Sequence, residues 1–165
     1  MRVFIALIGL FLCIGFTEIV NKEYIKEYNE SGTLIAEGWM QKGEKTDFWK
    51  FYNDDSQLIS EGHYRENLKD GFWRFYAHKK TKEEGHFKAG EKTDWWTQYQ
   101  LKNYHKIITQ FKNDKKDGYR LYYNRFSLNK VEEYNSDQLK GSWTDYSTFK
   151  KDHPDFSMAD LKGKK

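Results

Sequence analysis

Cysteine, one-sided charge and long apolar runs are scarce in this chain of 165 residues, and each scarcity excludes a class of protein. Cys13 is the only cysteine, so the chain can form no disulfide framework and no cysteine-based metal site. Its 28 basic and 25 acidic residues are interspersed and leave a net charge of +3, without the basic patch typical of nucleic-acid binders. No nucleophile elbow, P-loop or dinucleotide fingerprint occurs. We therefore predict a protein that is not an enzyme, needs no cofactor and binds no nucleic acid.

The longest apolar run lies at the N-terminus. It extends from Val3 to Phe16, follows Arg2 and is succeeded by polar residues. This is the pattern of a secretory signal peptide, and the run is shorter than the ~20 apolar residues that span a membrane. Cys13 follows Leu12 rather than the small residue of a bacterial lipobox, which argues against lipidation. We predict that residues 1–20 are a signal peptide or, if uncleaved, an N-terminal membrane anchor. Export to the periplasm, cell surface or medium follows from either reading.

Aromatic residues are abundant although the chain is polar overall. They make up 18% of the sequence, 32% of the residues are charged and the mean hydropathy is -0.99. Each large ring can bury roughly 150–250 Å². The composition therefore favours an ordered but thin structure over a disordered chain or a thick globule.

An aromatic phrase recurs with a period of 23 or 24 residues. TDFWKFY at residues 46–52 returns as DGFWRFY (70–76), TDWWTQY (93–99), DGYRLYY (117–123) and, weakly, KGSWTDY (140–146). A second phrase lies between these copies, as AEGWM (36–40), SEGHY (60–64) and EEGHF (83–87). Because two different phrases keep one register, we interpret residues 21–146 as about five repeats.

The two phrases of each unit predict the two strands of a β-hairpin, since both are rich in aromatic and β-branched residues. Turn-forming residues separate them at 29–32 and 53–56, and we predict turns between units at 42–47, Asp70-Gly71 and Asp117-Gly118. A unit is too short for a crossover helix. The predicted fold is all-β, an elongated, open antiparallel β-meander. Strand alternation places Phe48, Lys50 and Tyr52 on one face and Trp49 and Phe51 on the other.

The phrases D-G-x-W-x-x-Y and G-x-L-x-x-E-G-x-Y resemble the MORN repeat, and especially its bacterial variant of the YwqK type. The likeness covers residues 24–146 and departs where Asp47 and Asp94 replace the usual glycine. Aspartate tolerates left-handed backbone better than most residues, so we expect the local conformation to survive. The resemblance implies an elongated, twisted sheet of hairpins that serves as a scaffold or interaction surface. YwqK-type members are often described as antitoxins, a role that an export leader disfavours.

Three sets of repeated side chains are candidate sites. The first is an aromatic strip, for which core packing is the default interpretation and a ligand-binding face or a protein interface the alternative, formed by Trp49, Trp73, Trp96, Phe51 and Phe75. His63 and His86 share one column about 10 Å apart, too far for one metal ion, so we predict surface positions without metal. Glu37, Glu61 and Glu84 each precede a glycine, and we predict cross-strand pairing with Lys50 and Arg74 rather than a glycosidase pair, because active sites are not repeated. Those glycines are expected at a bulge or beneath a ring.

The repeat ends at Tyr146. Residues 147–165 are predicted to form a C-terminal cap or a flexible basic tail, with a short helix over 154–161 in which Phe156 and Leu161 would cover the end of the sheet. Together these features predict a non-enzymatic, exported scaffold that binds an unknown protein or cell-envelope component through an aromatic-lined sheet. A glycan- or cell-wall-binding module that uses the tryptophans, and an antitoxin-like protein, are the alternatives. The oligomeric state is left open.

Overall fold

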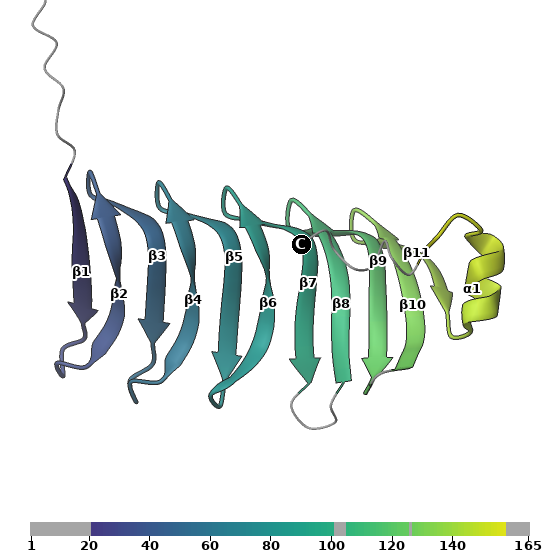
Figure 1. The fold of residues 1–165 in the computed structure, drawn as a ribbon, viewed down its shortest axis with the longest axis horizontal. Coiled ribbons are helices and arrows are strands. Elements are labelled where there is room, and N and C mark those ends of the chain that lie inside the picture. Colours follow the sequence, from purple (N-terminus) through teal and green to yellow (C-terminus); the bar gives the residue numbers. More distant parts are fainter. Residues whose placement is uncertain (1–20, 101–104, 126, 158–165) are drawn as a thin grey trace, which may run out of the picture.

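The described part of the chain forms a single elongated antiparallel sheet, followed by one helix after its last strand (Figure 1). The computed structural model describes residues 21–100, 105–125 and 127–157. Eleven strands lie side by side in sequence order. They are β1 (Lys22–Tyr28), β2 (Leu34–Gln41), β3 (Glu44–Tyr52), β4 (Leu58–Arg65), β5 (Leu68–Ala77), β6 (Lys80–Lys88), β7 (Glu91–Gln100), β8 (His105–Lys112), β9 (Lys115–Asn124), β10 (Ser127–Asn135) and β11 (Gln138–Trp143), followed by α1 (Tyr146–Asp152). The predicted all-β open meander is confirmed. The predicted leader, residues 1–20, lies outside the described residues.

Asparagine side chains close the hairpin turns within the first two units. The Asn53 side-chain oxygen accepts hydrogen bonds from the backbone N–H groups of Asp55 (3.1 Å) and Gln57 (2.8 Å), and Asn29 acts in the same way on Ser31 and Thr33. Asparagine suits this place because its short amide can replace a backbone partner in a turn. The turns predicted at 29–32 and 53–56 are confirmed.

Five turns at the opposite edge connect one unit to the next. Their two central residues both have positive φ, as a type I′ hairpin turn requires, and they are Lys42-Gly43, Glu66-Asn67, Ala89-Gly90, Asn113-Asp114 and Ser136-Asp137. The turns also bond to the unit before them. Asn67 accepts from the Lys45 N–H at 2.7 Å through its side chain and donates its own N–H to the Lys45 carbonyl at 3.0 Å. Asp114 makes the same two bonds with Lys92. Consecutive hairpins are therefore fastened at their turns as well as along their strands.

The turns predicted at Asp70-Gly71 and Asp117-Gly118 are wrong, because both pairs lie inside strands. The register between β4 and β5 shifts beside them, where His63 pairs with Asp70 while Gly62 pairs with Trp73, which leaves Gly71 and Phe72 as extra residues of a bulge. Gly71 has a φ of 78°. The aspartates that stand at the same place, Asp47 and Asp94, have φ values of 52° and 58°. The left-handed conformation expected of these aspartates is confirmed.

Each bulge turns a tryptophan ring onto a glycine of the neighbouring strand. A β-carbon at Gly62 would lie less than 3.0 Å from the Trp73 ring, and Gly38 and Gly85 have the same relation to Trp49 and Trp96. The indole N–H then donates to the carbonyl of the residue after the glycine, at 2.9 Å from Trp73 to His63. The prediction that these glycines lie beneath a ring is confirmed.

The C-terminal helix begins earlier than predicted, at Tyr146 rather than near Pro154. Asp145 is its N-cap, and its side chain accepts from the Ser147 N–H at 2.6 Å. The buried side chains of Phe149 and Phe156 pack on Leu121 and Val131. The C-terminal segment therefore covers the end of the sheet with Phe156, as predicted. Leu161 lies outside the described residues.

Candidate binding surface and the pocket at its end

The tryptophan column is the core of the sheet. Trp49, Trp73 and Trp96 have no exposed surface, and the half-buried Phe51 and Phe75 stack between them. Phe51 lies 5.9 Å from Trp49 and 6.2 Å from Trp73 between ring centroids, and Phe75 links Trp73 to Trp96 in the same way. In this arrangement no tryptophan of the column presents a ring face to a ligand. The structure therefore places this aromatic strip in the core-packing role, which was the default interpretation of the sequence.

Lysines cover this side of the sheet, which we call the Trp face. The Nζ atoms of Lys45, Lys69 and Lys92 lie 3.9, 4.7 and 4.0 Å from the ring centroids of Trp49, Trp73 and Trp96. Their aliphatic chains screen the rings, and the ammonium groups contribute cation–π attraction. Sequence reasoning missed these residues, although a lysine recurs with the same 23–24-residue period two positions before each bulge.

Among the described residues, two of these lysines have a carboxylate partner and one has none. Lys45 bonds to Glu27 at 3.1 Å and Lys92 to Glu83 at 2.5 Å. Within the described part of the chain Lys69 forms no ion pair, because Phe51 and Ser60 stand where the acidic residues of the other units stand. Burial, and then the nearby charge of Lys92, lower the pKa of Lys69.

The opposite side, which we call the Phe face, carries a row of exposed rings. Trp39, Phe48 and Phe72 are 37 to 38% exposed and Tyr24 is 49% exposed. Cross-strand pairs join the members of the row: Tyr24 meets Trp39 at 5.3 Å, and Phe48 and Phe72 meet His63 and His86 at 5.2 Å each. The two histidines are therefore edge partners of rings. Among the described residues no cluster of histidine, cysteine or acidic side chains suits a metal ion.

A ladder of alternating charge runs beside this row. The register pairs Lys26 with Glu37, Glu37 with Lys50, Lys50 with Glu61, and Arg74 with both Glu61 and Glu84. The closest ion pair joins Arg74 and Glu84 at 3.1 Å. The predicted cross-strand placement of these glutamates opposite Lys50 and Arg74 is confirmed.

The glutamates of the ladder also accept hydrogen bonds from tyrosine hydroxyl groups. Tyr52 donates to Glu37 at 2.7 Å, Tyr76 to Glu61 at 2.5 Å and Tyr99 to Glu84 at 2.8 Å. Burial, followed by the bond to a carboxylate, raises the pKa of Tyr76 and of Tyr99 to about 12. Each of these carboxylates thus lies between a basic residue and a tyrosine of neighbouring strands, and its hydrogen bond fixes the position of the tyrosine side chain on the Phe face.

The charged ladder becomes apolar where α1 covers it. After Glu84 the same column continues through Thr97, Ile108, Leu121, Val131 and Trp143. Trp143 therefore lies under α1 and donates to Asp152 at 2.8 Å. KGSWTDY is the weak copy of the aromatic phrase, and its Trp143 lies outside the Trp column, because Ser142 pairs with Glu132 and occupies the column instead.

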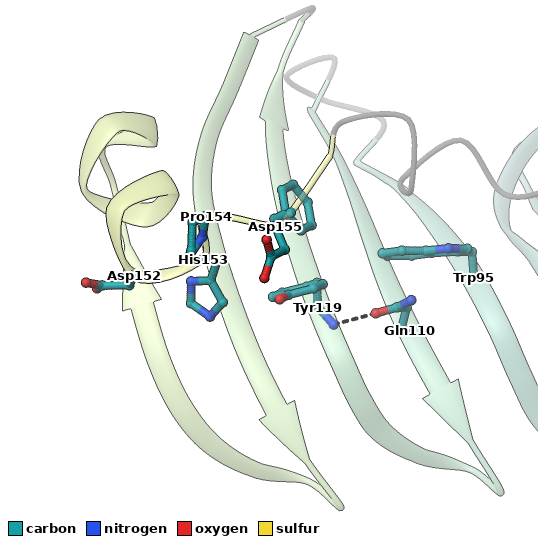
Figure 2. A pocket seen from close by; sticks show the side chains of 8 residues that line it. Trp95, Gln110, Tyr119, Asp152, His153, Pro154 and Asp155 are labelled. Carbon is teal, nitrogen blue, oxygen red and sulfur yellow. Dashed lines mark hydrogen bonds between the residues drawn. The ribbon is translucent and has the colours of Figure 1, made fainter.

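A cavity of about 460 Å³ lies where the row of rings meets the C-terminal segment (Figure 2). Trp95, Gln110 and Tyr119 come from β7, β8 and β9, and residues 152–156 complete the lining. Sequence reasoning missed this site, because its parts come from three strands and from the segment after the helix.

A scan against protein-family models finds no match for this chain, and a search of curated proteins finds no relative. Among the described residues no helix is long and apolar enough to cross a membrane. The fold itself defines the class: an all-β repeat protein built from consecutive hairpins.

Proposed function

We propose that this protein is an exported, non-enzymatic scaffold of the MORN-like class, which binds a protein or cell-envelope partner through the Phe face. The observation that carries the proposal is the row of exposed rings on β1 to β6, where Trp39, Phe48 and Phe72 are each more than a third exposed. Exposed aromatic groups that are grouped, rather than scattered, are typical of interaction sites.

The repetition of the sheet supports an extended partner. Equivalent residues of neighbouring units are about 10 Å apart, two strand spacings, so the row offers one ring pair per unit along the sheet. The charged ladder beside it supplies a polar border, as is usual around an apolar contact. The Trp face is less suited to this role, because lysines already cover its rings.

Site-specific crosslinking in the native cell tests the proposal. A photoreactive amino acid at position 48 or 72 is expected to capture the partner, and the double variant Phe48→Ser/Phe72→Ser is expected to lose it. Ile59→Ser and Leu68→Ser are matched controls, since both residues are exposed apolar side chains outside the row. Equal losses in the row and control variants, or crosslinks from neither row position, would contradict the proposal. Fractionation of the same cells tests export, and a purely cytoplasmic protein would contradict it.

A further inference from the structure

The row of rings on the Phe face is interrupted at Gln110. His63 and His86 hold the equivalent place in the two preceding units and pack against Phe48 and Phe72. Gln110 instead folds down toward the backbone, where its Oε1 accepts the Tyr119 N–H at 2.7 Å. Gly118 makes this possible, because a β-carbon there would overlap the Gln110 amide. An imidazole is thus absent between Trp95 and Tyr119, and the cavity occupies the space above Gln110 (Figure 2).

The segment that follows α1 forms the remaining wall. Phe156 meets Tyr119 edge-on, with 5.0 Å between ring centroids. The Lys150 ammonium holds the segment in place by donating to the carbonyls of Pro154 (2.6 Å) and Phe156 (2.5 Å). The cavity is therefore formed before any ligand arrives, and its volume lies in the usual range of small-molecule sites, about 300–1,000 Å³.

The lining carries two carboxylates, those of Asp152 and Asp155, and one imidazole, that of His153. Asp152 accepts from the Trp143 indole, while Asp155 makes no hydrogen bond or ion pair within the part of the chain that the structure describes. Of the basic groups nearby, Lys150 is bonded to two carbonyls, and His153 contacts the Phe149 carbonyl and, at 3.3 Å, Glu133. No lysine or arginine is among the described residues that line the cavity.

We propose that this cavity binds a small organic cation of the alkylammonium class, between the rings of Trp95 and Tyr119 and with Asp155 as its counterion. Tryptophan and tyrosine faces attract cations through their quadrupoles, most strongly where water is excluded. The carboxylates add Coulomb attraction. An anion would meet only repulsion from the same groups. The inference does not rest on the proposed function, because the cavity lies beside the covered end of the row.

The test uses choline and its neutral isostere, 3,3-dimethyl-1-butanol, which differ chiefly in charge. Full-length protein labelled with ¹⁵N is titrated, and the Trp95 indole resonance, assigned with the variant Trp95→Phe, reports occupancy. Choline is expected to shift this resonance with saturation, and the neutral alcohol to bind at least about tenfold more weakly, a factor within the range of a cation–π contact.

Two variants and one control separate this site from non-specific binding. Gln110→His restores the imidazole found in the earlier units, fills the cavity and is expected to weaken choline binding about tenfold or more. Asp155→Asn removes an exposed carboxylate without a described partner, cannot unfold the protein by breaking a contact, and is expected to weaken binding about fivefold. Asp55→Asn is the matched control for charge and should leave binding unchanged. Equal binding of choline and the alcohol, retention of choline by both variants, or a shift with N-acetylglucosamine but not with choline would each overturn the proposal.

Discussion

The indole ring of Trp73 lies where a β-carbon of residue 62 would be. Glycine is therefore the residue type that fits at position 62 without displacing the ring. The same relation joins Gly38 to Trp49 and Gly85 to Trp96. In the fourth unit both partners change together: Arg120 stands in the Trp column and Thr109 in the glycine position, and the two are paired in the register. Ring and glycine thus form one packing unit that lets a single sheet bury its core without a second layer.

We expect Gly62→Ala to destabilise the protein by about 1–3 kcal/mol, because the added methyl group must displace the Trp73 ring and weaken its bond to the His63 carbonyl. Urea denaturation measures the effect. In a Trp73→Leu background the same substitution should cost much less. Equal costs in the two backgrounds would show that the ring is not the obstacle.

At Gly71, with a φ of 78°, we expect the stability of variants to fall in the order aspartate, alanine, valine. Aspartate already occupies this bulge position in two other units with positive φ, as Asp47 and Asp94, whereas β-branched residues are strongly disfavoured there. The expected span from aspartate to valine is about 1–2 kcal/mol. Thermal melts of the three variants check the order, and a valine variant as stable as the aspartate one would contradict it.

Lys69→Met and Lys92→Met should differ although both lysines lie over a tryptophan. Loss of Lys92 leaves the half-buried Glu83 without its partner at 2.5 Å, whereas Lys69 has no carboxylate to leave behind. We expect Lys92→Met to cost at least about 1 kcal/mol more than Lys69→Met. Because burial lowers the pKa of Lys69, its deprotonation relieves a cost of folding. The stability of the wild type relative to Lys69→Met should therefore rise as the pH rises toward the ordinary lysine pKa.

Alkaline pH should loosen the tyrosine–glutamate bonds of the Phe face. The folded pKa of Tyr76 is about 12, raised above its unfolded value of 10.0 by burial and by Glu61. A raised pKa means stability that is fully present below pH 10 and is lost as the pH approaches 12. Tyr76→Phe should cost about 1 kcal/mol at pH 7 and reduce the loss between pH 10 and 12. Urea denaturation of wild type and Tyr76→Phe at pH 7 and at several values between pH 10 and 12 checks this. An equal loss of stability in the two proteins over the alkaline range would contradict it.

Phe149→Ala is expected to open the C-terminal end alone. Phe149 is fully buried on the cluster that contains Leu121 and Val131, and each hairpin contacts only its neighbours. Hydrogen exchange in β9 to β11 should accelerate by a factor of ten or more, since loss of a buried phenylalanine costs about 3–5 kcal/mol, while β3 to β5 stay protected. Uniform acceleration across the sheet would indicate global rather than local unfolding.

Periodicity in the chain was enough to predict the hairpins, their order and the two faces. Strand alternation separates Phe48 from Trp49 regardless of what covers either side, and two phrases in one register leave few other topologies. The asparagine-closed turns and the left-handed aspartates also followed from local preferences. These features depend on contacts between residues that are close in the sequence, which is why they can be predicted from the sequence alone.

Contacts between strands determined the features that the sequence did not predict: the bulges, the position of Trp143, the exposed row of rings and the cavity. Asp70-Gly71 has the composition of a turn, but Trp73 can reach Gly62 only if Gly71 and Phe72 form a bulge after Asp70. Trp143 shares the phrase of the Trp column, but a one-residue difference in register sends it beneath α1. The exposed row and the cavity beside Gln110 likewise arise from side chains on different strands. A shift of one residue reverses the face of every side chain that follows, and only the pairing between strands determines that shift.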